Sequence, residues 1–249
     1  MSLDSDVRTA AALLGAANRV FVLTGAGLGV ASGLRTFRGD GGYWRDTAVE
    51  TLASRAGFAR DPDLVWAWYN ERFAAYAAAE PNAGHRALVE LEGHVPHFFL
   101  ATQNVDGLQK RAGSRALVEL HGDLQHVRCT GCSYRAALDA PFDVAALTHD
   151  CGGKIRPNIV WFGESLPLEA WDRAARESAA ADAVIVAGTS LLVHPAASLA
   201  RVGDERVVVI EINPEATGGP NVLALQTGTE IALPAIVAAI ASNPRGAAP

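Results

Sequence analysis

Gly25 and Gly27, separated by the small Ala26, follow directly on an apolar run at residues 20–24. A glycine-spaced loop after a strand exposes backbone N–H groups where a helix begins, and such a surface binds phosphate. The two glycines let the backbone turn tightly and approach a pyrophosphate closely. A plain turn between strand and helix has the same spacing, so the motif alone leaves both interpretations open.

The segment after this turn stays polar and rich in glycine instead of passing straight into a helix, and it contains Thr36, Phe37 and Arg38. Arg38 can meet phosphate charge, and Phe37 can cover an aromatic ring or exclude water. We therefore expect a dinucleotide site at which chemistry is done.

The three cysteines indicate a metal site. Cys129 and Cys132 form a C-x-x-C pair, and Cys151 stands at the distance expected for the second half of a zinc ribbon. A complete ribbon has another cysteine three residues before Cys151, where this chain has Thr148. His149 or Asp150 can supply a fourth ligand, of which we favour His149; a metal-free loop is the alternative.

Tyr69 and Arg72 lie three residues apart in a segment with a helical pattern. Side chains at that spacing share a helix face, so a phenol and a guanidinium can point into one pocket. Together they suit a carboxylate, since a forked cationic donor then has a hydroxyl beside it. The alternative is a half-buried tyrosine beside a solvated arginine.

These residues need elements to position them. Near-continuous apolar runs at 20–24, 97–102, 183–187 and 207–212 alternate with helical patterns at 6–17, 63–79, 82–91, 168–180 and 231–241. Such alternation indicates a parallel sheet covered on both faces, which is a doubly wound α/β fold with ligands at the carboxyl ends of its strands. Polar residues follow four of the expected strands, which predicts one shared crevice.

Two stretches depart from this alternation, a Trp-rich helical segment at 43–79 and a loop-like, cysteine-bearing segment at 128–156. We expect them to form a smaller domain. The Rossmann-like domain then comprises residues 1–42, 80–127 and 157–249.

The bulk composition excludes several classes of protein. With 249 residues, 49% of them hydrophobic, the chain can bury one large core. A net charge of −6 argues against nucleic acid as the main partner, and an odd number of cysteines argues against a disulfide framework. The N-terminal residues are acidic where a secretory signal needs basic ones. We expect a cytoplasmic, monomeric protein that does not bind membranes.

Taken together, the motifs resemble those of sirtuins, the NAD-dependent protein lysine deacylases. They are GAG at 25–27, TFRG at 36–39, TQNVDGL at 102–108, ELHG at 119–122, the C-x-x-C pair, VWFGE at 160–164 and GTSLLV at 188–193. The resemblance extends from residue 20 to about residue 234. It implies a Rossmann-like large domain, a small domain built from a helical insertion and a zinc-binding insertion, and acylated lysine-containing proteins or peptides as partners.

By this resemblance NAD lies along four strand ends and the start of the last helix. The residues implied are Gly25, Ala26, Gly27, Thr36, Phe37, Arg38, Trp44, Gln103, Asn104, Val105, Asp106, Gly188, Thr189, Ser190, Asn213, Pro214, Glu215 and Thr229. Asn104 and Asp106 are expected to bond the nicotinamide and its ribose. Capping of the helix that begins near Asp106 is the alternative role.

The reaction implied by the resemblance assigns the general base to His121. The acyl-lysine carbonyl oxygen attacks the ribose carbon that carries nicotinamide, nicotinamide leaves, and a base then activates a ribose hydroxyl. A group titrating near neutrality suits that step, and histidine is such a group. The resemblance singles out His121 among the seven histidines of the chain.

Within the family, Tyr-x-x-Arg at this place resembles class III sirtuins, which remove succinyl and malonyl groups from lysine. Ala53 matches their small pocket residue, and Val160, Trp161, Phe162, Gly163 and Glu164 resemble the segment that holds the substrate peptide as an added strand. We expect desuccinylation and demalonylation to be favoured, with deacetylation possible.

One departure from the family concerns Gly29, which stands where a serine is common. It removes a hydroxyl near the cofactor loop, so we expect altered NAD binding with activity retained. The competing functions are protein mono-ADP-ribosylation, a non-catalytic NAD or ADP-ribose sensor, and a zinc-ribbon nucleic-acid binder that the net charge disfavours.

Overall fold

The computed structural model describes residues 2–36, 49–138 and 141–242. Its larger part is a six-stranded sheet in the order β3-β2-β1-β7-β8-β9, with every neighbouring pair parallel. The strands are β1 (Arg19–Thr24), β2 (His97–Thr102), β3 (Leu117–Glu119), β7 (Ala183–Ala187), β8 (Val208–Ile212) and β9 (Val222–Leu225). Their central members are buried along almost their whole length.

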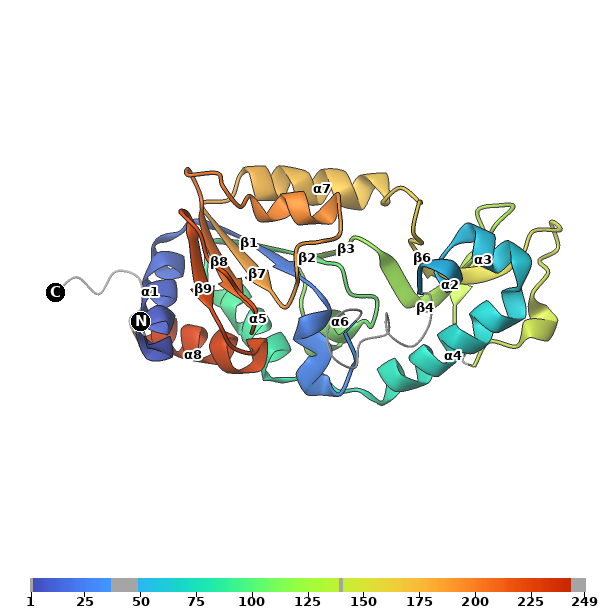
Figure 1. The fold of residues 1–249 in the computed structure, drawn as a ribbon, viewed down its shortest axis with the longest axis horizontal. Coiled ribbons are helices and arrows are strands. Elements are labelled where there is room, and N and C mark those ends of the chain that lie inside the picture. Colours follow the sequence, from blue (N-terminus) through green and yellow to red (C-terminus); the bar gives the residue numbers. More distant parts are fainter. Residues whose placement is uncertain (1, 37–48, 139–140, 243–249) are drawn as a thin grey trace.

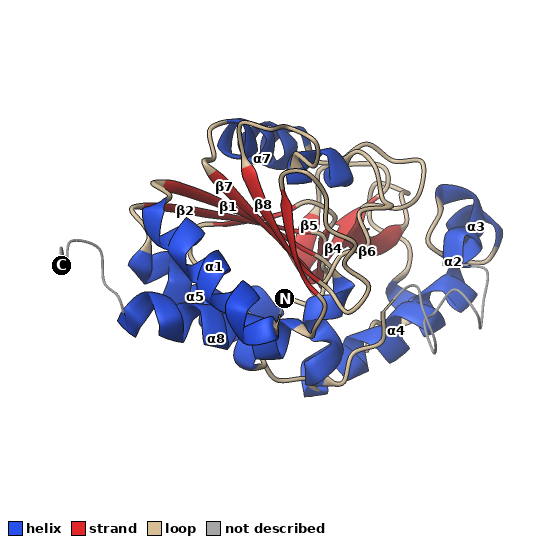
Figure 2. Cartoon of the chain, turned by 60° about the vertical axis from the view of Figure 1, so that its left-hand side comes forward, coloured by secondary structure: helices blue, strands red, loops and turns tan. Residues whose placement is uncertain are grey.

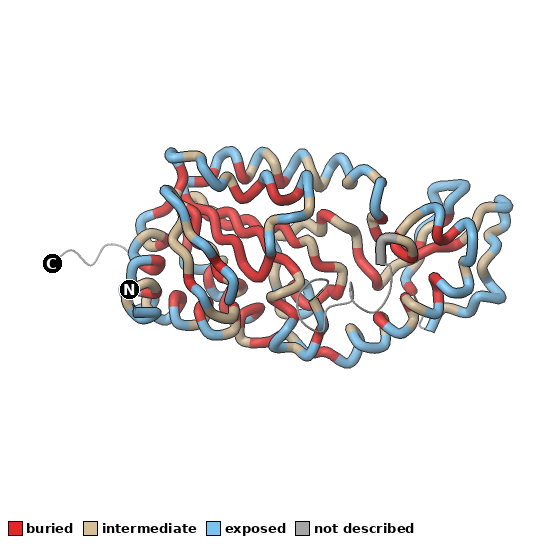
Figure 3. The backbone as a smooth tube through the Cα atoms, in the orientation of Figure 1, coloured by how far each residue is buried: buried red, intermediate tan, exposed pale blue. Residues whose placement is uncertain are grey.

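Helices cover both faces of this sheet, as Figures 1 and 2 show. On one face lie α1 (Leu3–Ala16), α5 (Ala83–His94) and α8 (Thr229–Ser242), whose apolar side chains share a core with β1 and β7. On the other face lie α7 (Leu168–Ala179) and the short 3-10 helix η4 (Ala196–Ala200). The strands are therefore continuously apolar because both of their faces are buried, as the sequence pattern indicated. Figure 3 shows this buried centre.

The smaller part of the molecule joins helices to an antiparallel sheet. The helices are α2 (Val49–Leu52), α3 (Arg55–Arg60) and α4 (Pro62–Ala78), and the sheet has the order β5-β4-β6. Its strands are β4 (Gly122–Cys129), β5 (Arg135–Ala137) and β6 (Ile155–Ile159), and η3 (Val144–Ala146) lies between the last two. A separate core contains Trp66, Tyr69 and Trp161, and it joins the helices to the sheet.

The doubly wound fold with a smaller domain is confirmed, but the sequence pattern missed several strands. Segment 128–156 is loop-like over most of its length, as expected, but it contains β5 and the ends of β4 and β6. Short strands with arginines and Pro157 lack the apolar alternation that identifies a strand. The pattern also missed β3 and β9, which lie at the two edges of the large sheet. The domain boundaries expected at 127/128 and 156/157 stay a prediction, and both positions lie within strands, β4 and β6.

The remaining expected elements lie close to the observed ones, and β2 and β7 have the bounds that the pattern predicted. After β1 the chain enters a 3-10 helix, η1 (Ala26–Ser32), and after β2 it forms the short α6 (Leu108–Ala112). In the part of the chain that the structure describes, no helix is both long and apolar enough to cross a membrane.

Candidate functional site

The glycine turn lies where the strand order of the large sheet reverses, between β1 and β7. In doubly wound sheets the ligand crevice forms at this point. The Gly25 N–H donates to the Ala187 carbonyl at 3.1 Å, and the Gly27 N–H donates to the Gly188 carbonyl at 2.7 Å. A Cβ on Gly25 would lie 2.6 Å from the Thr189 Cβ, and one on Gly27 would lie 2.7 Å from the Gly188 Cα. Both positions therefore require glycine, because two strand-end backbones pack directly against each other.

The segment after β2 is joined to the same turn. Gln103 Nε2 donates to Thr189 Oγ1 at 3.1 Å, and Asn104 Nδ2 donates to the Gly25 carbonyl at 3.0 Å. The Asn104 side chain is buried, so this bond fixes the position of its amide. The polar residues expected to share one crevice are brought together here.

Asp106 is buried in the same loop, and its Oδ1 accepts the Leu108 N–H at 2.8 Å. This bond satisfies one N–H at the start of α6, although the N-cap residue itself is Gly107, which has no side-chain cap bond. Burial raises the pKa of Asp106 to about 6. At neutral pH the carboxylate is ionised and able to accept a hydrogen bond from an amide or hydroxyl.

His121 lies between β3 and β4, and its Nδ1 is 3.0 Å from the Gln103 carbonyl oxygen. A carbonyl only accepts, so Nδ1 carries the proton and Nε2 is left as an acceptor. Burial lowers the pKa of His121, which keeps the imidazole neutral at physiological pH. Gln103 adjoins Asn104, which bonds Gly25, so the imidazole and the glycine turn belong to one hydrogen-bonded unit.

The other residues expected to bind the cofactor differ in their hydrogen bonds and in their burial. Asn213 Nδ2 donates to the Thr189 carbonyl at 3.2 Å, and Asn213 Oδ1 accepts the Glu215 N–H at 3.0 Å. Pro214, Glu215 and Ser190 are exposed, whereas Ala26, Thr36 and Val105 are half-buried. Phe37, Arg38 and Trp44 lie outside the described residues.

A dinucleotide fits this donor set. Thr229, the first residue of α8, is buried, and its Oγ1 has no hydrogen-bond partner among the described residues. The Gly25 and Gly27 N–H groups donate to strand-end carbonyls, so the turn contributes close backbone approach to a pyrophosphate rather than these two donors. Asn213 and Glu215 follow β8 and offer acceptors for a ribose, which in other dinucleotide folds is bound by an acid about 20 residues beyond the glycines.

Tyr69 and Arg72 lie on α4 and are both buried, with 3% of each exposed. The Tyr69 hydroxyl accepts the Trp161 indole N–H at 2.8 Å. Arg72 Nη1 donates to the Trp68 carbonyl at 3.0 Å, and its Cζ lies 3.1 Å from the centre of the Trp68 ring. Burial raises the pKa of Tyr69, so the phenol stays protonated despite the nearby Arg72. The alternative of a solvated arginine is wrong.

The segment Val160–Glu164 connects this helical part to His121. The Val160 N–H donates to the His121 carbonyl at 2.9 Å, and the Phe162 N–H donates to the Ala53 carbonyl at 3.0 Å. Phe162 forms a parallel bridge with Ser54 and is 42% exposed, and Gly163 has a φ of +80° that only glycine adopts freely. The chain thus turns at this segment with an aromatic side chain left open to solvent.

Glu164 closes the segment, and its carboxylate binds three arginines. The distances are 2.7 Å to Arg55, 3.1 Å to Arg128 and 2.6 Å to Arg156. Burial alone would raise the pKa of Glu164, but hydrogen bonds from Arg156 and the Trp161 N–H hold it at about 2. Glu164 thus ties α3, β4 and β6 to the turn.

The cysteines gather with His149, as the sequence predicted. The donor atoms of Cys129, Cys132, His149 and Cys151 all lie within 4.8 Å of one another. Ligand pairs around a tetrahedral zinc with bonds of ~2.3 Å lie about 3.8 Å apart. The Cys129–Cys151, Cys132–His149 and His149–Cys151 pairs are 3.4, 3.6 and 3.3 Å apart, so the set fits a structural zinc ion.

The neighbouring residues explain why His149 takes the missing cysteine's place. Thr148, at the position of that cysteine, pairs with Lys154 in an antiparallel bridge, and the cluster contains His149 rather than Asp150. A Cβ on Gly153 would lie 2.6 Å from the Cys129 Sγ, so glycine is needed for the two halves to close.

Two positioning residues escaped the sequence reasoning. Asn82 caps α5 and also donates to the Leu28 carbonyl at 2.7 Å, which holds η1 in place. Gln109 is buried and donates to the hydroxyls of Thr24 and Thr102, at the ends of β1 and β2. Threonines that end two apolar strands were the available signal.

Comparison with known proteins gives a consistent result. The family model described as "Sir2 family" matches residues 25–195. A protein of Deinococcus radiodurans named NAD-dependent protein deacylase is 50% identical over 221 residues, which are 85% of this chain and 89% of its own. One of Aquifex aeolicus with the same name is 46% identical over 202 residues, which are 80% and 84%. A solved structure titled as a Sir2 homolog–NAD complex has a TM-score of 0.85 at 40% identity and covers 93% of both chains.

The fold and the site define an NAD-dependent enzyme of the protein deacylase class. The glycine turn at the strand-order reversal and the half-buried His121 both lie within the residues that the family model matches. The chain belongs to the Sir2 family.

Proposed function

We propose that this protein removes acyl groups from lysine side chains of proteins and favours succinyl and malonyl over acetyl groups. Nicotinamide and O-acyl-ADP-ribose are the products that accompany the free lysine. Bound NAD supplies a ribose carbon from which nicotinamide can leave. The residues of this chain bind that cofactor, orient the acyl-lysine and accept a proton.

His121 is the proton acceptor in this proposal. Its Nδ1–H is held by the Gln103 carbonyl, so its free Nε2 can take a proton from a ribose hydroxyl. Burial lowers the pKa of His121, so the base form prevails at neutral pH. Asn104 and the Asp106 carboxylate, fixed by bonds to Gly25 and Leu108, are suited to orient the nicotinamide end.

The acyl preference depends on one observation, which is a buried arginine on the same helix as a buried tyrosine. Tyr69 and Arg72 lie one helical turn apart, and the Tyr69 hydroxyl contacts Trp161 of the segment at 160–164. A carboxylate at the end of a short acyl chain is the complement of such a pair. An acetyl group has no charge to offset the desolvated guanidinium.

The test is a product analysis with matched substrates. The protein is incubated with NAD and peptides that differ only in acetyl-, succinyl- or malonyl-lysine, and products are identified by mass spectrometry. Faster release of nicotinamide and O-acyl-ADP-ribose from the two acidic acyl groups supports the proposal. Equal or faster deacetylation contradicts the preference, labelled protein points to ADP-ribosylation, and no turnover points to a sensor.

We also propose a monomer that acts on acylated proteins in the cytoplasm. All three cysteines are free of disulfides and gather at the candidate zinc site, which suits a reducing compartment. Light scattering coupled to size exclusion checks the monomer against its 26.1 kDa mass.

A further inference from the structure

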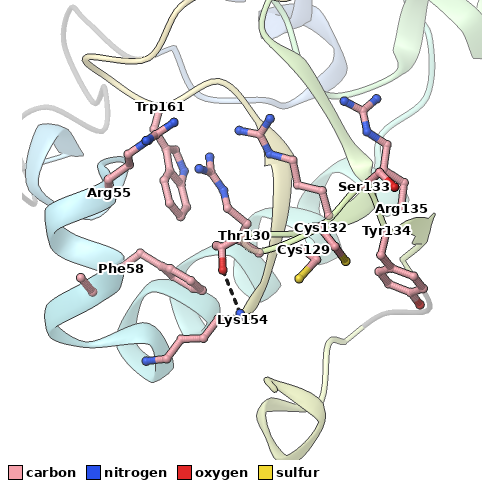
Figure 4. Close-up of a pocket in the computed structure, with 13 residues that line it drawn as sticks. Arg55, Phe58, Cys129, Thr130, Cys132, Ser133, Tyr134, Arg135, Lys154 and Trp161 are labelled. Carbon is pink, nitrogen blue, oxygen red and sulfur yellow. Dashed lines mark hydrogen bonds between the residues drawn. The ribbon is translucent and has the colours of Figure 1, made fainter. Parts of the chain in front are cut away.

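A cavity of about 620 Å³ lies between α3 and the three-stranded sheet, outside the NAD crevice. Figure 4 shows Arg55 beside Trp161 on one side of this cavity, Arg135 beside Tyr134 on the other, and Lys154 with Phe58 below. Five of its lining residues are cationic, namely Arg55, Arg128, Arg135, Lys154 and Arg156, and none of the described lining residues is acidic. A chain with a net charge of −6 thus concentrates positive charge at one place.

The strand register shows how closely these cations are set. Arg128 of β4 is paired with Arg135 of β5 on one side and with Arg156 of β6 on the other. Three arginines therefore stand in a row across the sheet, directly opposite one another. Like charges in that arrangement repel and destabilise the sheet.

Glu164 offsets only part of this charge. Its single carboxylate binds Arg55, Arg128 and Arg156 from one end of the row. Arg135 and Lys154 form no ion pair with any residue that the structure describes. Arg156, at one end of the row, is buried and already bound by Glu164, so the uncompensated cations of the cavity are Arg135, at the other end of the row, and Lys154. A ligand with two negative charges complements these two cations.

The position of the cavity indicates where such a ligand comes from. Its wall at Arg55 and Trp161 adjoins the bridge between Ser54 and Phe162. Glu164, which binds Arg55, ends the segment at 160–164, to which the family resemblance assigns the substrate peptide. In an extended peptide, side chains that point to the same face are ~6.6 Å apart, so two acids at alternate positions can each meet one of the two uncompensated cations.

We propose that this cavity binds acidic side chains that flank the acyl-lysine in the protein substrate. The inference rests on the proposed function and adds a preference for substrate sequence. Rim charges of this kind act on association and on KM more than on the chemical step. The preference is therefore carried by KM, and it weakens as salt rises.

The experiment uses succinyl-lysine peptides with two glutamates or two glutamines on the N-terminal or the C-terminal side. KM, kcat and the anisotropy of labelled peptides are measured at low and high salt. We expect one glutamate peptide to have a KM about fivefold or more below that of its glutamine partner, with kcat unchanged. In R135E/K154E, which leaves Glu164 and the metal donors intact, the preference should vanish or reverse.

The control R60E/R176E makes the same change of charge at exposed positions on α3 and α7, and it should keep the preference. Equal KM values for glutamate and glutamine peptides in the native protein overturn the inference, as does a preference unchanged in R135E/K154E. Inorganic phosphate that binds through Arg135 and Lys154 without any peptide preference also overturns it, in favour of a small-anion site. Turnover of the glutamine peptides tests the proposed function separately, and peptide anisotropy tests the cavity even without turnover.

Discussion

Replacing Arg72 with methionine tests the acyl-group pocket most directly. Arg72 is 3% exposed, its Cζ lies 3.1 Å from the centre of the Trp68 ring, and its Nη1 donates to the Trp68 carbonyl at 3.0 Å. Methionine keeps an unbranched apolar stem of similar length, so it retains much of the packing while it removes the charge. The variant therefore separates the guanidinium from its hydrocarbon chain.

The size of the effect follows from a hydrogen bond between a buried cation and a carboxylate. Such a bond contributes about 1.5–3 kcal/mol. One bond lost from the transition state lowers kcat/KM about 10- to 150-fold for succinyl-lysine and malonyl-lysine peptides. An acetyl-lysine peptide offers no carboxylate, so its kcat/KM should change by less than about threefold.

The assay measures kcat/KM for the three acylated peptides under saturating NAD, with Arg60→Met as the control at an exposed position of α3. Arg72→Lys keeps the charge without the forked donor and should lie between the native protein and Arg72→Met. An equal loss on acetyl and succinyl peptides would show that Arg72 only supports the fold. An unchanged rate of desuccinylation would remove the residue from the pocket.

Four further predictions concern the base, the metal, the arginine cluster and the glycine turn. Burial lowers the pKa of His121, so the acidic limb of kcat/KM should have its midpoint below pH 6.5, and a midpoint above pH 6.5 would contradict the lowering of the pKa by burial. Metal analysis should find one zinc per chain, and its removal by a chelator should lower Tm, whereas metal-free protein of unchanged Tm would refute the site. The pKa of Glu164, about 2, lies below its value in the unfolded chain, so Glu164→Gln should lower the free energy of unfolding by on the order of 3 kcal/mol above pH 4.5. Urea unfolding should show this deficit disappearing as the pH falls towards 2. A deficit that is independent of pH would contradict the prediction. Gly25→Ala places a Cβ 2.6 Å from the Thr189 Cβ and should weaken NAD binding measured by calorimetry. The matched control Gly93→Ala has open space at its Cβ, so it should leave NAD binding unchanged and stabilise α5 by about 0.5–1 kcal/mol.

The large sheet could be predicted because its strands are buried on both faces. Apolar runs such as those of β2 and β7 carry that burial in the sequence itself, so their bounds were predicted correctly. Edge strands β3 and β9 lie half-buried and escaped the same reasoning. In the small sheet the strands carry Arg128, Arg135 and Arg156, of which Arg135 is exposed, whereas Arg128 and Arg156 bind Glu164 from another segment.

The sequence by itself determined the fold class, the glycine turn and the cluster of metal-binding residues, because each depends on residue types at short or regular spacings. Only the tertiary structure decided between the favoured His149 and Asp150 as the fourth metal donor, and only it decided that Arg72 is buried against Trp68 and that three arginines form one row. It also decided which nitrogen of His121 is free, since that depends on a carbonyl 18 residues away. Contacts between distant segments fix protonation, burial and charge, and no local pattern encodes them.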